Sequence, residues 1–207
     1  MLTLYTLPGA CSTADHIALI WADVPHQIKV VTREDIKSPA YLAKNSSGAV
    51  PLLEEGDWVL TQNLAILTYI AALAPAAQLG AEGDARSQAE FYRTLAYLNA
   101  DFHGSFSTVF GAEYTGADAD QTEKVRAQGG RKVEAHLAKL EQQLAGQQYV
   151  YGGRRTVCDA YLWVMLGWVV HVLEGVLPQY PNVQAYYDFW AQDAGVQAAL
   201  KAEGLLS

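Results

Sequence analysis

The chain has 207 residues, is 51% hydrophobic and carries a formal net charge of −8, so it can bury a full core in one or two domains. Its lysines and arginines form no cluster, which argues against a nucleic-acid partner and against an anionic membrane surface. Cys11 and Cys158 are too few for a disulfide framework and lack metal-ligand spacing, so we expect no metal. The longest apolar run, Ala160 to Val172, has 13 residues and is too short to span a bilayer. No charged segment precedes the first strand-like run, and we expect a cytoplasmic protein.

The first 75 residues alternate between strand and helix patterns. Ser12 or Thr13 can cap the first helix, and Asp15 suits its first turn. The order is a βαβ unit, a short helical turn, and then an antiparallel hairpin closed by a helix, which predicts a mixed α+β domain over residues 1–75. The expected strands are Leu2–Tyr5, Gln27–Val31, Val50–Glu54 and Trp58–Leu60, and the expected helices are Ala14–Trp21, Ser38–Leu42 and Asn63–Leu73.

The second half of the chain has helical periodicity and no convincing strand. The segment Ala74–Arg86 is rich in alanine, glycine and proline and is predicted to be a linker. Gly129-Gly130 should weaken or bend the second of the helices that follow. We therefore predict an all-α domain over residues 87–207. Its expected helices are Ser87–Val109, Asp120–Leu144, Thr156–Leu173, Val183–Gln192 and Val196–Ala202.

Cys11 is the first candidate for chemistry because it follows Pro8-Gly9 where a strand turns into a helix. Free N–H groups and the helix dipole at that point favour a thiolate, which is the reactive form of cysteine. The alternative is a small buried hydrophobic residue. No second cysteine lies at C-x-x-C spacing, so a disulfide partner would have to be a small thiol. Ser12 either caps the helix or donates its hydroxyl to a sulfur.

Two further segments are weaker candidates. Pro51 in Gly48-Ala49-Val50-Pro51 follows an X-Pro bond, the kind of bond that adopts the cis form at modest cost. A cis bond would aim the backbone groups of Val50 at an extended peptide ligand, whereas an ordinary trans proline at a strand edge carries no such meaning. Gln62-Asn63 opens a helix, which is a geometry that binds anions, but simple capping by Asn63 is the plainer interpretation.

The order of these features resembles the glutathione S-transferases, and most of all their bacterial beta class. The resemblance spans the whole chain, and its strength lies in the combination of motifs. The matching segments are Pro8–Ser12 for P-G-A-C-S, Asn45–Pro51 for N-x-x-G-x-V-P, Thr61–Ile66 for T-E-S-x-A-I, Leu98–Phe106 for L-N-x-D-x-H-x-x-F, and Thr156–Tyr161 for the capping box before the buried helix.

The resemblance implies a thioredoxin-like N-terminal domain that binds glutathione and a helical-bundle domain that supplies the second-substrate site. In that family pattern Cys11 contacts the glutathione sulfur, with Ser12 as its neighbour, and the Val50 backbone binds the cysteinyl part. Pro51 is then cis, and Gln62 and Asn63 bind the γ-glutamyl end.

The helical domain contributes two more expected residues. The resemblance implies that His103 faces the active site and that Asp101 reaches the γ-glutamyl amine of a neighbouring subunit in a homodimer. Gly104 stands where some family members have a lysine after the histidine. Gln62 replaces the family's glutamate, which removes a negative charge from the γ-glutamyl site, and Asn63 replaces its serine.

The leading hypothesis is conjugation of glutathione, as co-substrate, to small hydrophobic electrophiles. A second hypothesis keeps the site and changes the reaction to glutathione-dependent thiol–disulfide exchange through a mixed disulfide on Cys11. A third, slightly favoured by Gln62, Asn63 and Gly104, is a non-catalytic glutathione-binding protein on the same fold.

Overall fold

The N-terminal part of the chain is built on one four-stranded sheet. A computed structural model describes residues 1–114 and 118–206. The strands β1 (Leu2–Thr6), β2 (His26–Val30), β3 (Leu52–Glu55) and β4 (Trp58–Thr61) lie in the order β2-β1-β3-β4. β1 runs parallel to β2 and antiparallel to β3, and β3 pairs with β4 as a hairpin. The predicted βαβ unit with a following hairpin is confirmed.

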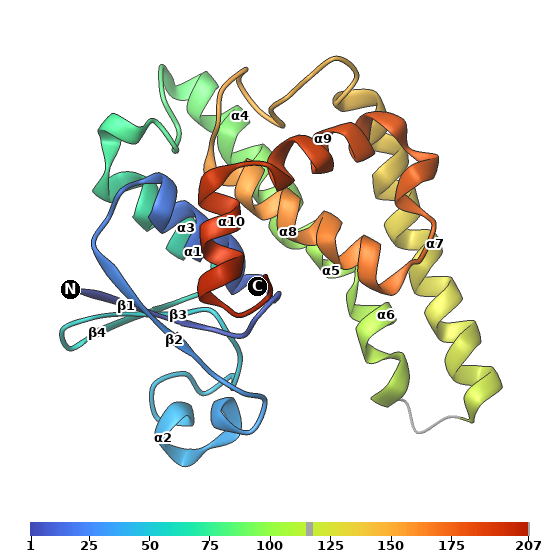
Figure 1. The fold of residues 1–207 in the computed structure, drawn as a ribbon, viewed down its shortest axis with the longest axis horizontal. Coiled ribbons are helices and arrows are strands. Elements are labelled where there is room, and N and C mark those ends of the chain that lie inside the picture. Colours follow the sequence, from blue (N-terminus) through green and yellow to red (C-terminus); the bar gives the residue numbers. More distant parts are fainter. Residues whose placement is uncertain (115–117, 207) are drawn as a thin grey trace.

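The alternation of side chains along β1 decides which helix covers which face of the sheet. Leu4 belongs to the core shared with Ile17 of α1 (Ser12–Trp21) and Ile66 of α3 (Asn63–Leu73). Tyr5 points to the opposite face and packs edge-on against Tyr41 of the short helix α2 (Pro39–Leu42), which follows a 3₁₀ turn, η1 (Asp35–Lys37). Figure 1 shows α1 and α3 together on one side of the sheet and α2 on the other.

α1 begins one residue after the candidate cysteine. Cys11 is its N-cap residue, in the right-handed helical conformation and without a side-chain capping bond. The expectation that Ser12 or Thr13 caps the helix is wrong, because both hydroxyls have partners elsewhere. Ser12 Oγ lies 2.9 Å from Thr6 Oγ1, and Thr13 Oγ1 donates to Glu203 at 2.7 Å.

The part of the chain after β4 that the structure describes is helical throughout. The predicted linker contains the 3₁₀ turn η2, and the next helix begins within it, at Ala85. The elements are η2 (Pro75–Ala77), α4 (Ala85–Ala96), η3 (Tyr97–Phe102), α5 (His103–Ser105), α6 (Ser107–Gly111), η4 (Ala112–Tyr114), α7 (Ala119–Gln143), α8 (Val157–Val172), η5 (Leu177–Gln179), α9 (Pro181–Ala191) and α10 (Ala194–Ala202).

The single helix expected over Ser87–Val109 is wrong. α4 gives way to η3, a π-helical segment, before the chain resumes in α5 and α6. Leu98, Phe102 and Phe106 are all fully buried and follow one another at steps of four residues, more than the 3.6 of an α-helix. The wider turn keeps these three side chains on one buried face, and it brings His103 to the start of α5.

α7 is continuous for 25 residues, so Gly129-Gly130 does not interrupt it as expected. A Cβ on Gly129 would lie 2.8 Å from Val109 Cγ2 and 2.9 Å from the Val109 backbone nitrogen. Glycine is therefore required because α6 and α7 approach closely at this point. The capping box predicted at Thr156 and Asp159 is confirmed, and Cys158 beside it is a fully buried core residue.

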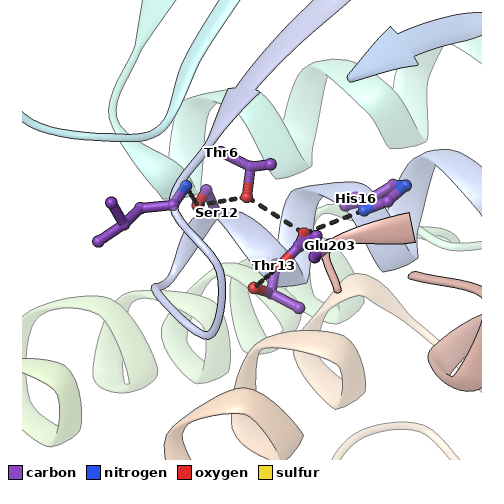
Figure 2. A network of polar contacts seen from close by, with 6 residues as sticks. Thr6, Ser12, Thr13, His16 and Glu203 are labelled. Atoms are coloured by element: carbon purple, nitrogen blue, oxygen red, sulfur yellow. Dashed lines mark hydrogen bonds and ion pairs between the residues drawn. The ribbon is translucent and has the colours of Figure 1, made fainter. Parts of the chain in front are cut away.

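The two parts of the chain share one hydrophobic core, in which α1 packs against α3, α8 and α10. Glu203, just after α10, closes this joint and is 5% exposed. Its carboxylate accepts hydrogen bonds from Thr6 Oγ1 at 3.1 Å and Thr13 Oγ1 at 2.7 Å, and lies 3.0 Å from His16 Nδ1. Figure 2 shows this network, which continues through Ser12.

Candidate active site

A cleft of about 640 Å³ opens between the sheet domain and the helical domain. A smaller cavity of about 230 Å³ adjoins it, and both are lined by Cys11, Ala49, Val50 and His103. The remaining residues of the smaller cavity are mostly polar and come from the loop before β3, the end of β4, the start of α3 and η3–α5: Asn45, Ser47, Pro51, Thr61, Gln62, Asn63, Asn99 and Gly104. The structure therefore brings together most of the site residues predicted from the sequence.

Cys11 lies where the two cavities meet and is a free, half-buried thiol. Its Sγ–H donates to the Val50 carbonyl oxygen at 3.6 Å. Burial raises the pKa of Cys11 to about 12. The expected preference for a thiolate is wrong for the free protein, because loss of solvation outweighs the favourable effect of the nearby backbone N–H groups. Cys11 is a neutral hydrogen-bond donor at neutral pH.

Ser12 is fully buried and does not line either cavity. Its Oγ accepts the backbone N–H of Leu7 at 3.3 Å in addition to its contact with Thr6. The hydroxyl therefore holds the loop that precedes Cys11, rather than facing the space where a ligand sulfur would lie.

The Val50-Pro51 peptide bond is cis. This agrees with the family pattern and not with the plainer trans interpretation of the sequence. Both residues lie in the wall of the smaller cavity, next to the start of α3.

Gln62 and Asn63 meet at the N-terminus of α3. Gln62 is the N-cap residue, with φ 75° and no side-chain capping bond, and Asn63 is the first helical residue. The interpretation of Asn63 as a simple cap is therefore wrong. Its amide lies between two groups of α1: in one orientation Nδ2 donates to the Cys11 carbonyl oxygen at 3.5 Å, and in the other it lies 3.0 and 2.7 Å from the carboxyl oxygens of Asp15.

His103 extends from the start of α5 into both cavities. Its Nδ1 lies 2.6 Å from the Tyr161 hydroxyl, which in turn donates to Asn99 Oδ1 at 3.2 Å. Burial lowers the pKa of His103, so the ring is neutral at neutral pH. Because the Tyr161 hydroxyl donates its hydrogen bond to Asn99, its oxygen must accept one from His103. Nδ1 is therefore the protonated nitrogen, and Nε2 is left as a hydrogen-bond acceptor.

Asp101 does not belong to the cleft of its own chain. It is exposed on η3, and its charge acts on Tyr97 and His136 rather than on the cleft residues. Gly104, in contrast, lines the smaller cavity, and a Cβ there would meet no atom within 4 Å.

Models of the two domains of one family match most of the chain. The glutathione S-transferase N-terminal domain matches residues 4–78 and the C-terminal domain matches residues 123–189. Glutathione S-transferase GST-4.5 of Xanthomonas campestris pv. campestris is 43% identical over 203 residues, which cover 98% of each chain. This chain is a member of the glutathione S-transferase family.

Solved structures support the assignment of this chain to the glutathione S-transferase family. A beta-class glutathione S-transferase of Sphingomonas chungbukensis superimposes with a TM-score of 0.86 at 35% identity, covering 99% of this chain and 100% of the other. A sphingomonad glutathione S-transferase complexed with glutathione gives 0.86 at 38% identity, with the same coverage. The predicted fold, a thioredoxin-like domain followed by a helical domain, is confirmed.

The larger cleft of this transferase has an aromatic wall that the sequence pattern did not identify. Trp168 of α8 and Phe110 of α6 line it, with their ring centres 5.5 Å apart. The Trp168 indole N–H donates to the Gly9 carbonyl oxygen at 2.7 Å, which ties the helical domain to the loop before Cys11. Trp168 stands at helical spacing within the apolar helix α8, a spacing that is more typical of a core residue than of a cleft residue. Arg33 also lines this cleft, as does Arg126, which forms an ion pair with Glu113 at 2.8 Å.

Within the two described ranges, no group of three or more histidine, cysteine, aspartate or glutamate side chains could hold a metal ion. Across the same residues, none of the helices combines the length and the apolar character needed to span a membrane.

Proposed function

We propose that this glutathione S-transferase conjugates glutathione to small hydrophobic electrophiles. The observation that carries the proposal is the junction of two unlike cavities at Cys11 and His103. The smaller, polar cavity suits a tripeptide with two carboxylates and an amine. The larger cleft, with its aromatic wall, suits an apolar partner, and the two reacting groups would meet where the cavities join.

The glutathione half of the site rests on backbone groups and a helix end. The Val50 backbone, next to the cis bond, would pair with the cysteinyl part of the tripeptide. The N-terminus of α3 has no side-chain cap, so its free N–H groups would receive the γ-glutamyl carboxylate beside Gln62 and Asn63. A structural neighbour that is complexed with glutathione supports the choice of this ligand.

At the sulfur, we assign complementary roles to Cys11 and His103. The neutral Cys11 thiol, which donates to the Val50 carbonyl in the free protein, would donate instead to the glutathione sulfur. His103 Nε2 would accept the proton of the glutathione thiol. The thiolate then forms a bond to the electrophilic carbon while the leaving group departs with its electron pair. Ser12 supports the loop and does not take part in this step.

The proposal is tested by measuring conjugation with 1-chloro-2,4-dinitrobenzene in the purified protein and in Cys11→Ala and Cys11→Ser variants. We expect turnover in the native protein. We also expect a loss of about fivefold in kcat/KM for Cys11→Ala, the size of one hydrogen bond, and a smaller loss for Cys11→Ser, which keeps a donor. Absence of turnover with glutathione still bound would indicate the non-catalytic alternative.

The raised pKa of Cys11 argues against thiol–disulfide exchange as the main reaction, because the attacking group would have to be a thiolate. The same variants separate the two reactions. A Cys11→Ala protein that keeps conjugation and loses glutathione-dependent disulfide reduction would assign the second reaction, but not the first, to this thiol.

We further infer that the protein acts in the cytoplasm as a homodimer, with Asp101 directed at the γ-glutamyl amine in the partner subunit. The exposed position of Asp101, outside the cleft of its own chain, supports this role. Large apolar side chains are exposed at the start of β4, at the end of α3 and on α4, among them Trp58, Leu73 and Tyr92, and would be covered in a dimer. Light scattering would give twice the chain mass of 22.5 kDa for the dimer.

A further inference from the structure

Asp15 is a fully buried carboxyl group that the proposed reaction does not use. It lies in α1, one turn beyond Cys11, and faces the side chain of Asn63 at the start of α3. Asn63 is 4% exposed and lines the smaller cavity, so its amide separates the buried carboxyl from the space assigned to the γ-glutamyl end.

The Asn63 amide has two orientations with opposite consequences for a ligand. When Nδ2 points to the Cys11 carbonyl, Oδ1 faces the carboxyl oxygens of Asp15, and this contact is a hydrogen bond only if Asp15 carries a proton. When Nδ2 points to Asp15, it donates to an ionised carboxylate, and Oδ1 is turned toward the carbonyl oxygen of Cys11. The protonation of Asp15 and the direction of the amide are therefore linked.

The surroundings of Asp15 favour the protonated acid. Burial raises the pKa of Asp15 well above its usual range, and the charge of Glu203, which follows α10, raises it further. Three other titratable groups lie around Asp15: His16, which contacts Glu203, Cys11 at the start of the same helix, and Tyr161 of α8. Burial also raises the pKa values of Cys11 and Tyr161, so both stay neutral near pH 7.

We propose that Asp15 is a positioning residue for glutathione: as the protonated acid it donates to Asn63 Oδ1 and turns the amide N–H₂ toward Cys11 and the γ-glutamyl carboxylate. This inference rests on the proposed function and adds to it. An ionised Asp15 would reverse the amide and place a second negative charge beside the ligand carboxylate.

The test compares Asp15→Asn, which can still donate to Asn63 Oδ1, with Asp15→Leu, which has the same number of side-chain heavy atoms as aspartate and cannot donate. The probe is S-methylglutathione, whose blocked thiol does not titrate, and its affinity is measured by calorimetry. We expect Asp15→Asn to bind within twofold of the native protein and Asp15→Leu to bind about fivefold more weakly, the loss of one hydrogen bond. In an Asn63→Ala background both Asp15 variants should bind alike.

Equal affinities of the two Asp15 variants, or an equal effect of Asp15→Leu with and without Asn63, would overturn the inference. If Asp15→Leu does not fold, the pH dependence decides. Native affinity should fall as the pH rises and Asp15 ionises, relative to Asp15→Asn, and matching profiles would overturn the inference as well. A native protein that does not bind the probe at millimolar concentration would instead refute the glutathione function itself.

Discussion

His103 shows how one residue can be prepared for proton transfer by a neighbour that never meets the substrate. The Tyr161 hydroxyl oxygen accepts a hydrogen bond from Nδ1 of the ring, and the hydroxyl donates its own hydrogen bond to Asn99. Burial raises the pKa of Tyr161 far above its ordinary value, so the hydroxyl keeps that hydrogen at every physiological pH. The arrangement fixes the tautomer of His103 and leaves one nitrogen to act as a base.

The residue-scale prediction follows from that arrangement. Tyr161→Phe removes the partner of Nδ1 and should lower kcat/KM for conjugation about fivefold, with a smaller change in the KM for glutathione. Tyr151→Phe is the matched control, because that hydroxyl donates to the Ser87 carbonyl away from the cleft. Equal effects of the two substitutions on kcat/KM would contradict the role given to Tyr161.

The pH dependence of kcat/KM provides a second test of the role of His103. Burial lowers the pKa of His103 from 6.5, so the neutral ring persists below pH 6.5, and kcat/KM should fall only as the pH drops through the lowered value. The stability linked to this group has the same sign. It is present above pH 6.5 and is lost as the pH falls through the folded-state pKa.

Sequence patterns predicted the identity of most site residues better than their electrostatic state. Cys11, Val50 and His103 were placed by motif and spacing, and the structure brings them together. The pKa of Cys11 was not predictable, because it depends mainly on how deeply the thiol is buried in the folded protein. The helical periodicity of the sequence places Asp15 in the first turn of a helix but does not predict its burial.

At the scale of elements, the sequence predicted most strands and helices within about two residues, and the helix after the linker was the exception. Apolar residues at steps of three and four fit an α-helix, and a single wider turn hardly alters that pattern. The π-helical segment Tyr97–Phe102 therefore went unpredicted, although it immediately precedes His103. π-turns often occur at functional sites, which agrees with its place here.

The element-scale prediction concerns the contact between α6 and α7. Gly129→Ala should destabilise the protein by about 1–3 kcal/mol, because the new Cβ would meet backbone atoms of Val109 that cannot move aside. Gly130→Ala is the matched control: its Cβ would lie 3.1 Å from Leu173 Cδ2, the end of a side chain, and the added helix propensity offsets the contact. Thermal unfolding measures both, and an equal loss of stability in the two variants would contradict this account. Because Val109 and Phe110 line the cleft, Gly129→Ala should also raise the KM for the electrophile.

At the scale of the whole molecule, the site exists because two domains share a core. The cleft lies between them, and Trp168 of α8 bonds to the Gly9 carbonyl across the joint. The sequence predicted two domains but not this joint, because its contacts link residues more than 150 positions apart. His16 on the first helix is buried against Glu203 in this joint.

The last prediction concerns the hydrogen bonds by which Glu203 connects the C-terminal segment to the sheet domain. Glu203→Gln replaces one carboxylate oxygen with an N–H₂ group, which cannot accept the hydrogen bonds now given by Thr6, Thr13 or the His16 ring. Leaving a buried donor without its acceptor should cost about 1–3 kcal/mol in the free energy of unfolding. The network continues through Ser12 to the Leu7 N–H, so the loop before Cys11 should also loosen and kcat/KM should fall. Glu90→Gln is the control, because its exposed ion pair with Arg93 contributes little to stability. Equal denaturation midpoints for the two variants would mean that the joint is held by apolar packing alone.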